Sequence, residues 1–223
     1  MSLARRLPSG WPGALAAALG ALLAAPFALY AVALAVDALG GPSEPSRFFA
    51  PDRPIATAAV YAHMATGGVL TLLVFLQVPR ALRSQFPAFH RWTGRLAVSL
   101  ALLTALAGLA YIVWRGTIGG PWMSAGFALY GLLLGAAAGC AWSAARARDF
   151  ERHRAWALRL AVLALGSWVY RVAYGLWYLA TDGLWSNEAF TGAFDITMFF
   201  AFYLVPLAFL ELWQARHRAR LRP

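Results

Sequence analysis

The chain has 223 residues, of which 61% are hydrophobic and only 13% are charged, a composition outside the usual range of a soluble domain. Its net charge of +10 does not indicate nucleic-acid binding, because every positive residue is an arginine and the arginines follow the apolar stretches along the chain. Cys140 is the single cysteine, which excludes an intrachain disulfide and a thiolate metal cluster. The composition therefore predicts an integral membrane protein whose first partner is the lipid bilayer.

Six stretches are apolar over about the 20 residues that a helix needs to cross the hydrocarbon core. In chain order they are Trp11 to Val36, Thr57 to Gln77, Thr93 to Trp114, Trp122 to Ala144, Trp156 to Ala180 and Ala193 to Gln214. The first is longer than the apolar part of a signal peptide, so we expect a retained span. No link between the stretches is long enough for a soluble domain. The sequence predicts an all-α, polytopic bundle of about six transmembrane helices, with residues 1–223 as one domain.

The arginines are distributed unequally between the two sides of this bundle. Fifteen lie on one side: thirteen before the first stretch, after the last, or in the links that follow the second and fourth stretches, and two, Arg95 and Arg159, in the first residues of the third and fifth stretches. Arg47, Arg53 and Arg115 lie on the other side. Because short basic loops stay in the cytoplasm, we expect both termini to be cytoplasmic and the protein to be a multi-pass protein of a bacterial inner membrane. The cytoplasmic arginine clusters are expected to contact anionic lipid headgroups.

Two ionisable side chains lie deep in the outer half of the predicted bundle. His63 is in the second stretch and Arg171 in the fifth, where Arg171 shares one helical stripe with Tyr174. Such groups are expensive in lipid and are expected to face the bundle interior. Asp195, near the outer end of the last stretch, is the expected carboxylate partner of Arg171. We therefore predict a ligand-binding site of His63, Arg171, Tyr174 and Asp195. The alternative is a structural polar network, in which His63 bonds a backbone carbonyl.

Histidine also makes haem the most specific cofactor candidate, since His holds the iron while Arg holds a propionate. His63 is one candidate ligand. His90 and His153 form a second pair, each at a cytoplasmic helix start and each followed by Arg. For this pair the alternative is an interfacial role beside lipid headgroups. The sequence holds no catalytic motif and no metal-binding motif, and it does not decide whether the protein is an enzyme.

Three glycines in the fourth stretch are spaced four residues apart, at Gly131, Gly135 and Gly139. Small residues at this spacing let a second helix backbone approach closely. The spacing predicts a helix-packing seam, either within the bundle or in a homodimer.

The order of His63, "HRWTGR" from His90 to Arg95, "HRAWALR" from His153 to Arg159, and Arg171 resembles a family of bacterial predicted membrane proteins of unknown function. The resemblance covers Tyr61 to Tyr174 and departs at "HRAWALR", where the family pattern has Trp followed by Met. It implies a membrane bundle and no particular activity. In outline the chain is also similar to cytochrome b561-type bundles, which carry two b-haems. Two such haems need four histidines, so this likeness implies at most one bis-His site, from His90 and His153.

Three classes of function are consistent with these features. The first is a membrane protein that binds a ligand or cofactor at His63 and Arg171. The second is a small-solute or proton-coupled transporter, in which His63 titrates and Arg171 and Asp195 form a switching pair. The third is a structural or assembly protein whose glycine seam meets a partner.

Overall fold

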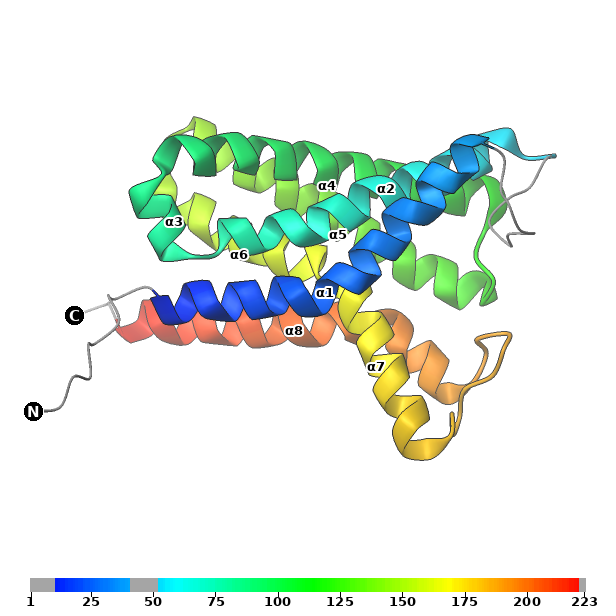
Figure 1. Ribbon diagram of the computed structural model, residues 1–223. Coiled ribbons are helices and arrows are strands. Elements are labelled where there is room, and N and C mark those ends of the chain that lie inside the picture. The colour runs from blue at the N-terminus through cyan, green and yellow to red at the C-terminus, as the bar shows by residue number, and fades with distance from the viewer. Residues whose placement is uncertain (1–10, 41–51, 221–223) are drawn as a thin grey trace, which may run out of the picture.

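The computed structural model describes residues 11–40 and 52–220, without the side chains of Trp11 and Arg220. These parts of the chain are helical throughout, with short turns and loops between helices (Figure 1). The elements are α1 (Trp11–Asp37), a 3-10 turn (Ala38–Gly40), α2 (Pro54–Gln77), α3 (Arg80–Gln85), α4 (Pro87–Arg115), α5 (Gly120–Arg146), α6 (Phe150–Ala164), α7 (Gly166–Thr181) and α8 (Ala193–Arg220).

The long helices match the predicted spans. Helices α1, α2, α4, α5 and α8 are each long and apolar enough to cross a membrane, and α6 with α7 makes a sixth candidate that bends by 42°. The all-α, multi-span prediction is thus confirmed. The fifth span differs from the expected continuous helix over Trp156 to Ala180, because it breaks at Leu165.

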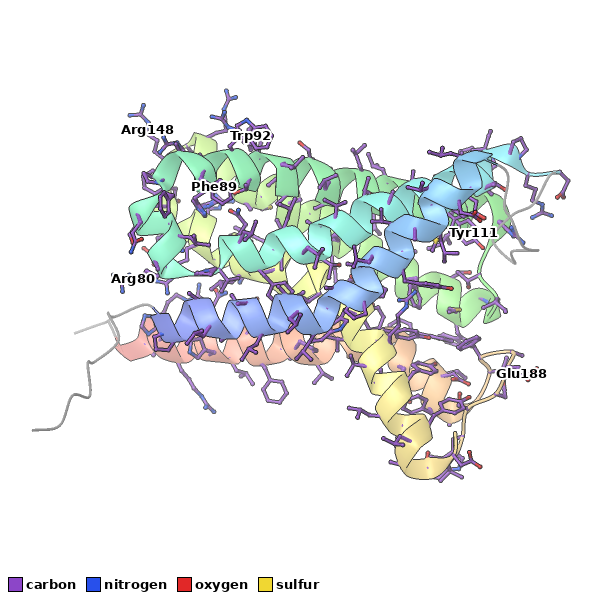
Figure 2. All side chains as sticks on the ribbon, in the orientation of Figure 1. Arg80, Phe89, Trp92, Tyr111, Arg148 and Glu188 are labelled. Carbon is purple, nitrogen blue, oxygen red and sulfur yellow. The ribbon has the colours of Figure 1, made fainter. Side chains whose placement is uncertain are left out.

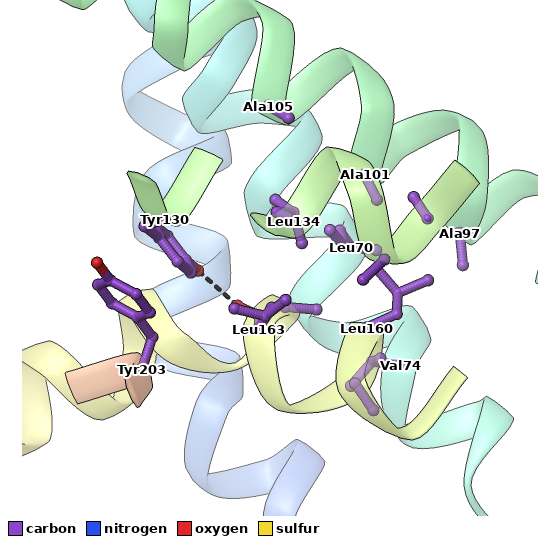
Figure 3. Close-up of a cluster of buried hydrophobic side chains, with 14 of the residues drawn as sticks. Leu70, Val74, Ala97, Ala101, Ala105, Tyr130, Leu134, Leu160, Leu163 and Tyr203 are labelled. Atoms are coloured by element: carbon purple, nitrogen blue, oxygen red, sulfur yellow. Dashed lines mark hydrogen bonds between the residues drawn. The ribbon is translucent and has the colours of Figure 1, made fainter. Parts of the chain in front are cut away.

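Side chains from two neighbouring helices stabilise this break. Tyr130 of α5 packs on Gly166, where an added Cβ would lie 2.9 Å from the tyrosine hydroxyl oxygen. The same hydroxyl donates to the carbonyl of Leu163 at 2.5 Å (Figure 3). Thr71 of α2 donates to the carbonyl of Ala164 at 3.4 Å. Carbonyls near a helix bend need such partners in an apolar environment, where water cannot supply them.

The core is formed where α2, α4, α5, α6 and α8 meet. Alanines such as Ala97, Ala101 and Ala138 are almost fully buried there and alternate with Leu70, Leu163 and other larger side chains (Figure 3). Small residues let neighbouring helices approach closely, which is how helices associate in membranes.

The two ends of the bundle differ in charge. Arg80 on α3 and Arg148 after α5 lie at the end where α8 finishes, and Glu188 lies at the other end (Figure 2). Helix α1 begins at the end where α8 finishes (Figure 1), as an even number of crossings requires. We call the end with Arg80 and Arg148 the arginine-rich end. The end with the α4–α5 and α7–α8 links is called the opposite end.

The glycine seam packs within the chain at two of its three positions. A Cβ on Gly131 would lie 3.3 Å from Leu109 of α4, and one on Gly135 would lie 3.6 Å from Ala105 of the same helix. Nothing described lies within 4 Å of a Cβ on Gly139. Gly131 and Gly135 therefore face α4 within the chain, and dimerisation stays a prediction.

Among the glycines of α5, the one that lies closest to a neighbouring helix is Gly126, outside this seam. A Cβ there would lie 2.6 Å from the carbonyl oxygen of Phe199 in α8, and a backbone atom cannot move aside as a side chain can. We expect Gly126→Ala to lower the free energy of unfolding by about 1–3 kcal/mol. The matched change Gly139→Ala, on the same helix in open space, should be neutral or gain up to about 1 kcal/mol. Thermal unfolding in detergent compares them, and equal midpoints would show that α5 and α8 do not pack as described.

Candidate functional site

A cavity of about 700 Å³ lies between α2, α4, α5 and α7, toward the opposite end of the bundle. Its apolar wall combines aliphatic side chains and methionines with six aromatic ones, namely Tyr111, Phe127, Tyr130, Tyr170, Tyr174 and Phe190. Its polar wall includes His63, Thr104, Arg115, Thr117, Ser167 and Arg171. This volume and this mixture of many apolar groups with a few polar ones are typical of small-molecule sites.

The bend between α6 and α7 makes room for the cavity. Helix α7 points away from the axis of α6 and away from α4 and α5 (Figure 1), so its inner face does not close against them. That face carries Ser167, Tyr170, Arg171 and Tyr174 into the cavity wall. Arg171 and Tyr174, which the sequence places on one stripe, both line the cavity. Tyr178, further along α7, instead donates a hydrogen bond to Ser186.

His63 is held by α4. Its Nδ1 lies 2.9 Å from the carbonyl oxygen of Thr104, and its ring packs against Gly108, where an added Cβ would come within 2.8 Å of Nδ1. A carbonyl oxygen can only accept, so Nδ1 carries the proton and Nε2 keeps a lone pair. The backbone hydrogen bond of the structural alternative is therefore present. It also leaves His63, in the cavity wall, with one nitrogen able to accept a hydrogen bond or to ligate a metal.

Arg171 lies at the mouth of the cavity rather than deep in the bundle interior. Its side chain is exposed, with Nη1 3.1 Å from the carbonyl of Ser167 and the guanidinium carbon 4.6 Å above the ring of Phe27 in α1. The expected interior position is not reached because α7 diverges from its neighbours. Arg171 and His63 nevertheless line the same cavity.

Asp195 is fully buried, and its hydrogen-bond partners include Tyr174 of the predicted site. It accepts hydrogen bonds from the hydroxyls of Tyr174 at 2.8 Å and Ser186 at 2.7 Å, and from the backbone N–H groups of Asn187 and Gly192. These donors belong to α7 and to the link that joins α7 with α8. Asp195 thus acts as a positioning residue, which fixes Tyr174 in the cavity wall and holds α7 to α8.

Tyr170 contributes a feature that the sequence analysis missed. Its hydroxyl is buried, and no group in the described residues meets hydrogen-bond geometry with it. Its ring packs against Tyr174 and Phe127 and lines the cavity. The nearest polar neighbour is the hydroxyl of Tyr174, which already donates to Asp195. A buried hydroxyl without a well-formed hydrogen bond is costly, so a ligand with a polar atom here would satisfy it. The arginine stripe did not reveal Tyr170, because Tyr170 lies one position before Arg171.

His90 and His153 lie away from this cavity, at the arginine-rich end. His90 lies in the first turn of α4, fourteen residues before Thr104, which is about 21 Å along a helix axis. His153 has Nδ1 2.9 Å from the carbonyl oxygen of Ala141, and Nδ1 of His90 is buried without a partner among the described residues. Neither histidine can share one ligand with His63.

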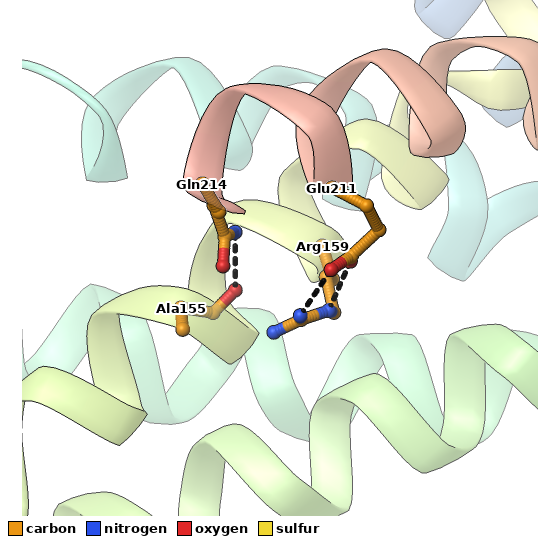
Figure 4. A network of polar contacts seen from close by, with 4 residues as sticks. All are labelled: Ala155, Arg159, Glu211 and Gln214. Atoms are coloured by element: carbon orange, nitrogen blue, oxygen red, sulfur yellow. Dashed lines mark hydrogen bonds and ion pairs between the residues drawn. The ribbon is translucent and has the colours of Figure 1, made fainter. Parts of the chain in front are cut away.

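A second polar cluster joins α6 to α8 nearer the arginine-rich end. Arg159 donates to Glu211 through Nε at 2.6 Å and Nη2 at 2.7 Å, and its guanidinium carbon lies 4.6 Å from the centroid of the Trp156 ring. Gln214 donates to the carbonyl of Ala155 at 3.4 Å. Figure 4 shows both contacts. The sequence did not predict this ion pair, because Glu211 lies 52 residues after Arg159 and no local spacing relates them.

Residues 60–214 match the family described as predicted membrane protein (DUF2306). The chain belongs to this family. The family is one of unknown function, so membership confirms the resemblance seen in the histidine and arginine pattern and assigns no activity. The match extends further than that pattern, through α8 to Gln214, and it includes the cavity, Asp195 and the Arg159–Glu211 pair. No curated protein and no solved structure matches the chain.

Proposed function

We propose that this DUF2306 protein binds an amphipathic molecule with an acidic group in the cavity between α2, α4, α5 and α7. The observation that carries the proposal is the meeting of two arginines, one histidine and an apolar wall rich in aromatic side chains around one cavity of about 700 Å³. The aromatic wall suits an apolar or planar body. Arg171 and Arg115 supply guanidinium groups for a carboxylate or phosphate.

Haem is the specific cofactor candidate in this class, because it combines an apolar ring, acidic groups and a metal. His63 would hold the iron, since its Nδ1–H is bonded to a carbonyl, as metal-ligating histidines usually have. Arg171 and Arg115 would hold the propionates. When bound, haem would supply redox chemistry.

Visible absorption of the purified protein tests this candidate. Protein from haem-supplemented cells is expected to show a Soret band that His63→Ala removes. His90→Ala and His153→Ala should keep the band, because both residues lie outside the cavity. A band lost only in His90→Ala and His153→Ala would indicate that haem binds at the arginine-rich end.

If wild type has no band, haem is excluded and the acidic ligand is an organic molecule without iron. In that case, mass spectrometry of solvent extracts should find a compound in wild type that is reduced or absent in a Tyr170→Trp variant, whose larger ring would narrow the cavity and whose indole lacks the phenol hydroxyl. Extracts of the same composition would contradict the proposal.

A transporter for the same class of molecule is the second candidate, favoured by the 42° bend between α6 and α7. Broken spans beside a binding site are a feature of secondary transporters. Uptake into proteoliposomes that depends on pH and on His63 would favour this function over simple binding.

We also propose that the arginine-rich end faces the cytoplasm across a bacterial inner membrane, following the excess of fifteen arginines over three. An externally active reporter that works when fused to Pro223 would contradict this orientation.

A further inference from the structure

A groove of about 410 Å³ lies between the first half of α6 and the last half of α8. It is separate from the cavity that holds His63 and Arg171, and it shares no lining residue with that cavity. The groove lies at the arginine-rich end, beside the Arg159–Glu211 pair. Its lining combines guanidinium groups with two tryptophans, Trp156 and Trp213.

Three guanidinium groups in the lining are available to a ligand. Arg152, Arg154 and Arg218 are exposed, and none of them forms an ion pair within residues 11–40 and 52–220. Arg159 is different, because Glu211 already neutralises it. Two carboxylates, Asp149 and Glu151, also line the groove. Three guanidinium groups against two carboxylates leave a net positive lining.

The aromatic part of the groove points to a ligand at the membrane surface. Trp213 is 50% exposed and stacks in parallel on His217, with ring centroids 5.7 Å apart. Tryptophan side chains are enriched where a membrane meets water. Along α8 toward the membrane interior, Phe209 and Leu212 are also exposed, at 68% and 56%. An acyl chain could therefore continue from the groove along α8.

We infer that this groove is a binding site for an anionic phospholipid, with a phosphodiester held by Arg152 and Arg218 and the acyl chains lying against α8. The single negative charge of a phosphodiester matches the net charge of the lining. A free phosphate would use the guanidinium groups and leave the exposed apolar face of α8 without a role. Basic pockets between membrane helices are known to bind acidic headgroups in this way.

Native mass spectrometry of the full-length protein in detergent tests the inference by lipid titration. Phosphatidylglycerol is expected to bind at least tenfold more tightly than phosphatidylcholine with the same acyl chains. Each arginine near a membrane surface contributes about 1 kcal/mol to such binding. The double variant Arg152→Gln/Arg218→Gln should therefore bind phosphatidylglycerol about 30-fold more weakly.

The matched control is Arg80→Gln/Arg83→Gln, which removes the same charge from exposed residues of α3 outside the groove. It should change the affinity less than threefold. All substituted arginines are exposed, so folding should be unaffected, and equal unfolding temperatures in phosphatidylcholine would verify this. An equal loss in both double variants would overturn the inference, since it would show a general surface charge rather than a site.

Two further measurements show whether the bound phosphodiester belongs to a lipid or to a soluble molecule. Glycerophosphoglycerol, the headgroup without acyl chains, should not compete at concentrations at which phosphatidylglycerol saturates the protein. Competition at equal concentrations would show that a soluble phosphodiester is the ligand and would overturn the lipid assignment. Equal binding of phosphatidylcholine would overturn the requirement for an acidic headgroup.

Discussion

Replacing Arg171 with leucine is expected to leave membrane insertion intact and to remove ligand binding at the cavity. Leucine is more favourable than arginine near the bilayer centre by about 3 kcal/mol, so α7 should still insert. A hydrogen bond to a charged group contributes about 1.5–3 kcal/mol, which corresponds to a roughly 10- to 150-fold loss of affinity. The amount of ligand retained by the purified protein measures this change.

In the same experiment, Arg171→Lys tests whether binding needs only the positive charge or also the planar guanidinium. If the acidic group is bound by two parallel N–H groups, lysine should not restore binding, because an ammonium lacks the planar fork. Arg53→Leu is the matched control, since Arg53 is also an exposed arginine but is not part of the cavity wall. Full ligand retention in Arg171→Leu would contradict the proposed site.

Breaking the Arg159–Glu211 pair is expected to have the largest effect on stability. Arg159→Leu leaves Glu211 without its bidentate partner between two apolar helices. Removing one member of a buried pair costs about 3–5 kcal/mol, whereas exposed pairs contribute about 0.2–1 kcal/mol. The Arg159 side chain is 17% exposed and that of Glu211 is 45% exposed. We therefore expect an intermediate loss of roughly 2–4 kcal/mol in the free energy of unfolding.

A double variant shows whether the loss comes from the unpaired charge. Arg159→Leu/Glu211→Leu should recover most of the stability, because two apolar side chains can replace a buried ion pair without a large cost. Arg95→Leu, at an exposed arginine of α4, should change the unfolding midpoint in detergent little. If the double variant is as unstable as Arg159→Leu alone, the guanidinium acts through packing on Trp156 rather than through Glu211.

The sequence by itself determined the class of protein and the positions of its spans. A crossing helix needs about 20 apolar residues whatever surrounds it, so composition along the chain is sufficient to locate α1, α2, α4, α5 and α8. The cost of ionisable groups in lipid likewise marked His63 and Arg171, and helical spacing placed Tyr174 beside Arg171. These are local properties of the chain, and the structure brings all three residues to one cavity.

The tertiary structure alone decided the partners of these residues. The bend at Leu165 is stabilised by Tyr130 of another helix, which donates to the carbonyl of Leu163. The residues of "HRAWALRLAVLALGSW" alone do not predict that contact. The bend redirects α7, which exposes Arg171 at the cavity mouth, while the α7–α8 link surrounds Asp195 with other donors. Arg159 meets Glu211 only because α6 packs against α8. Hydrogen-bond and ion-pair partners depend on the relative direction and rotation of helices, and those are set by packing between segments distant in the chain.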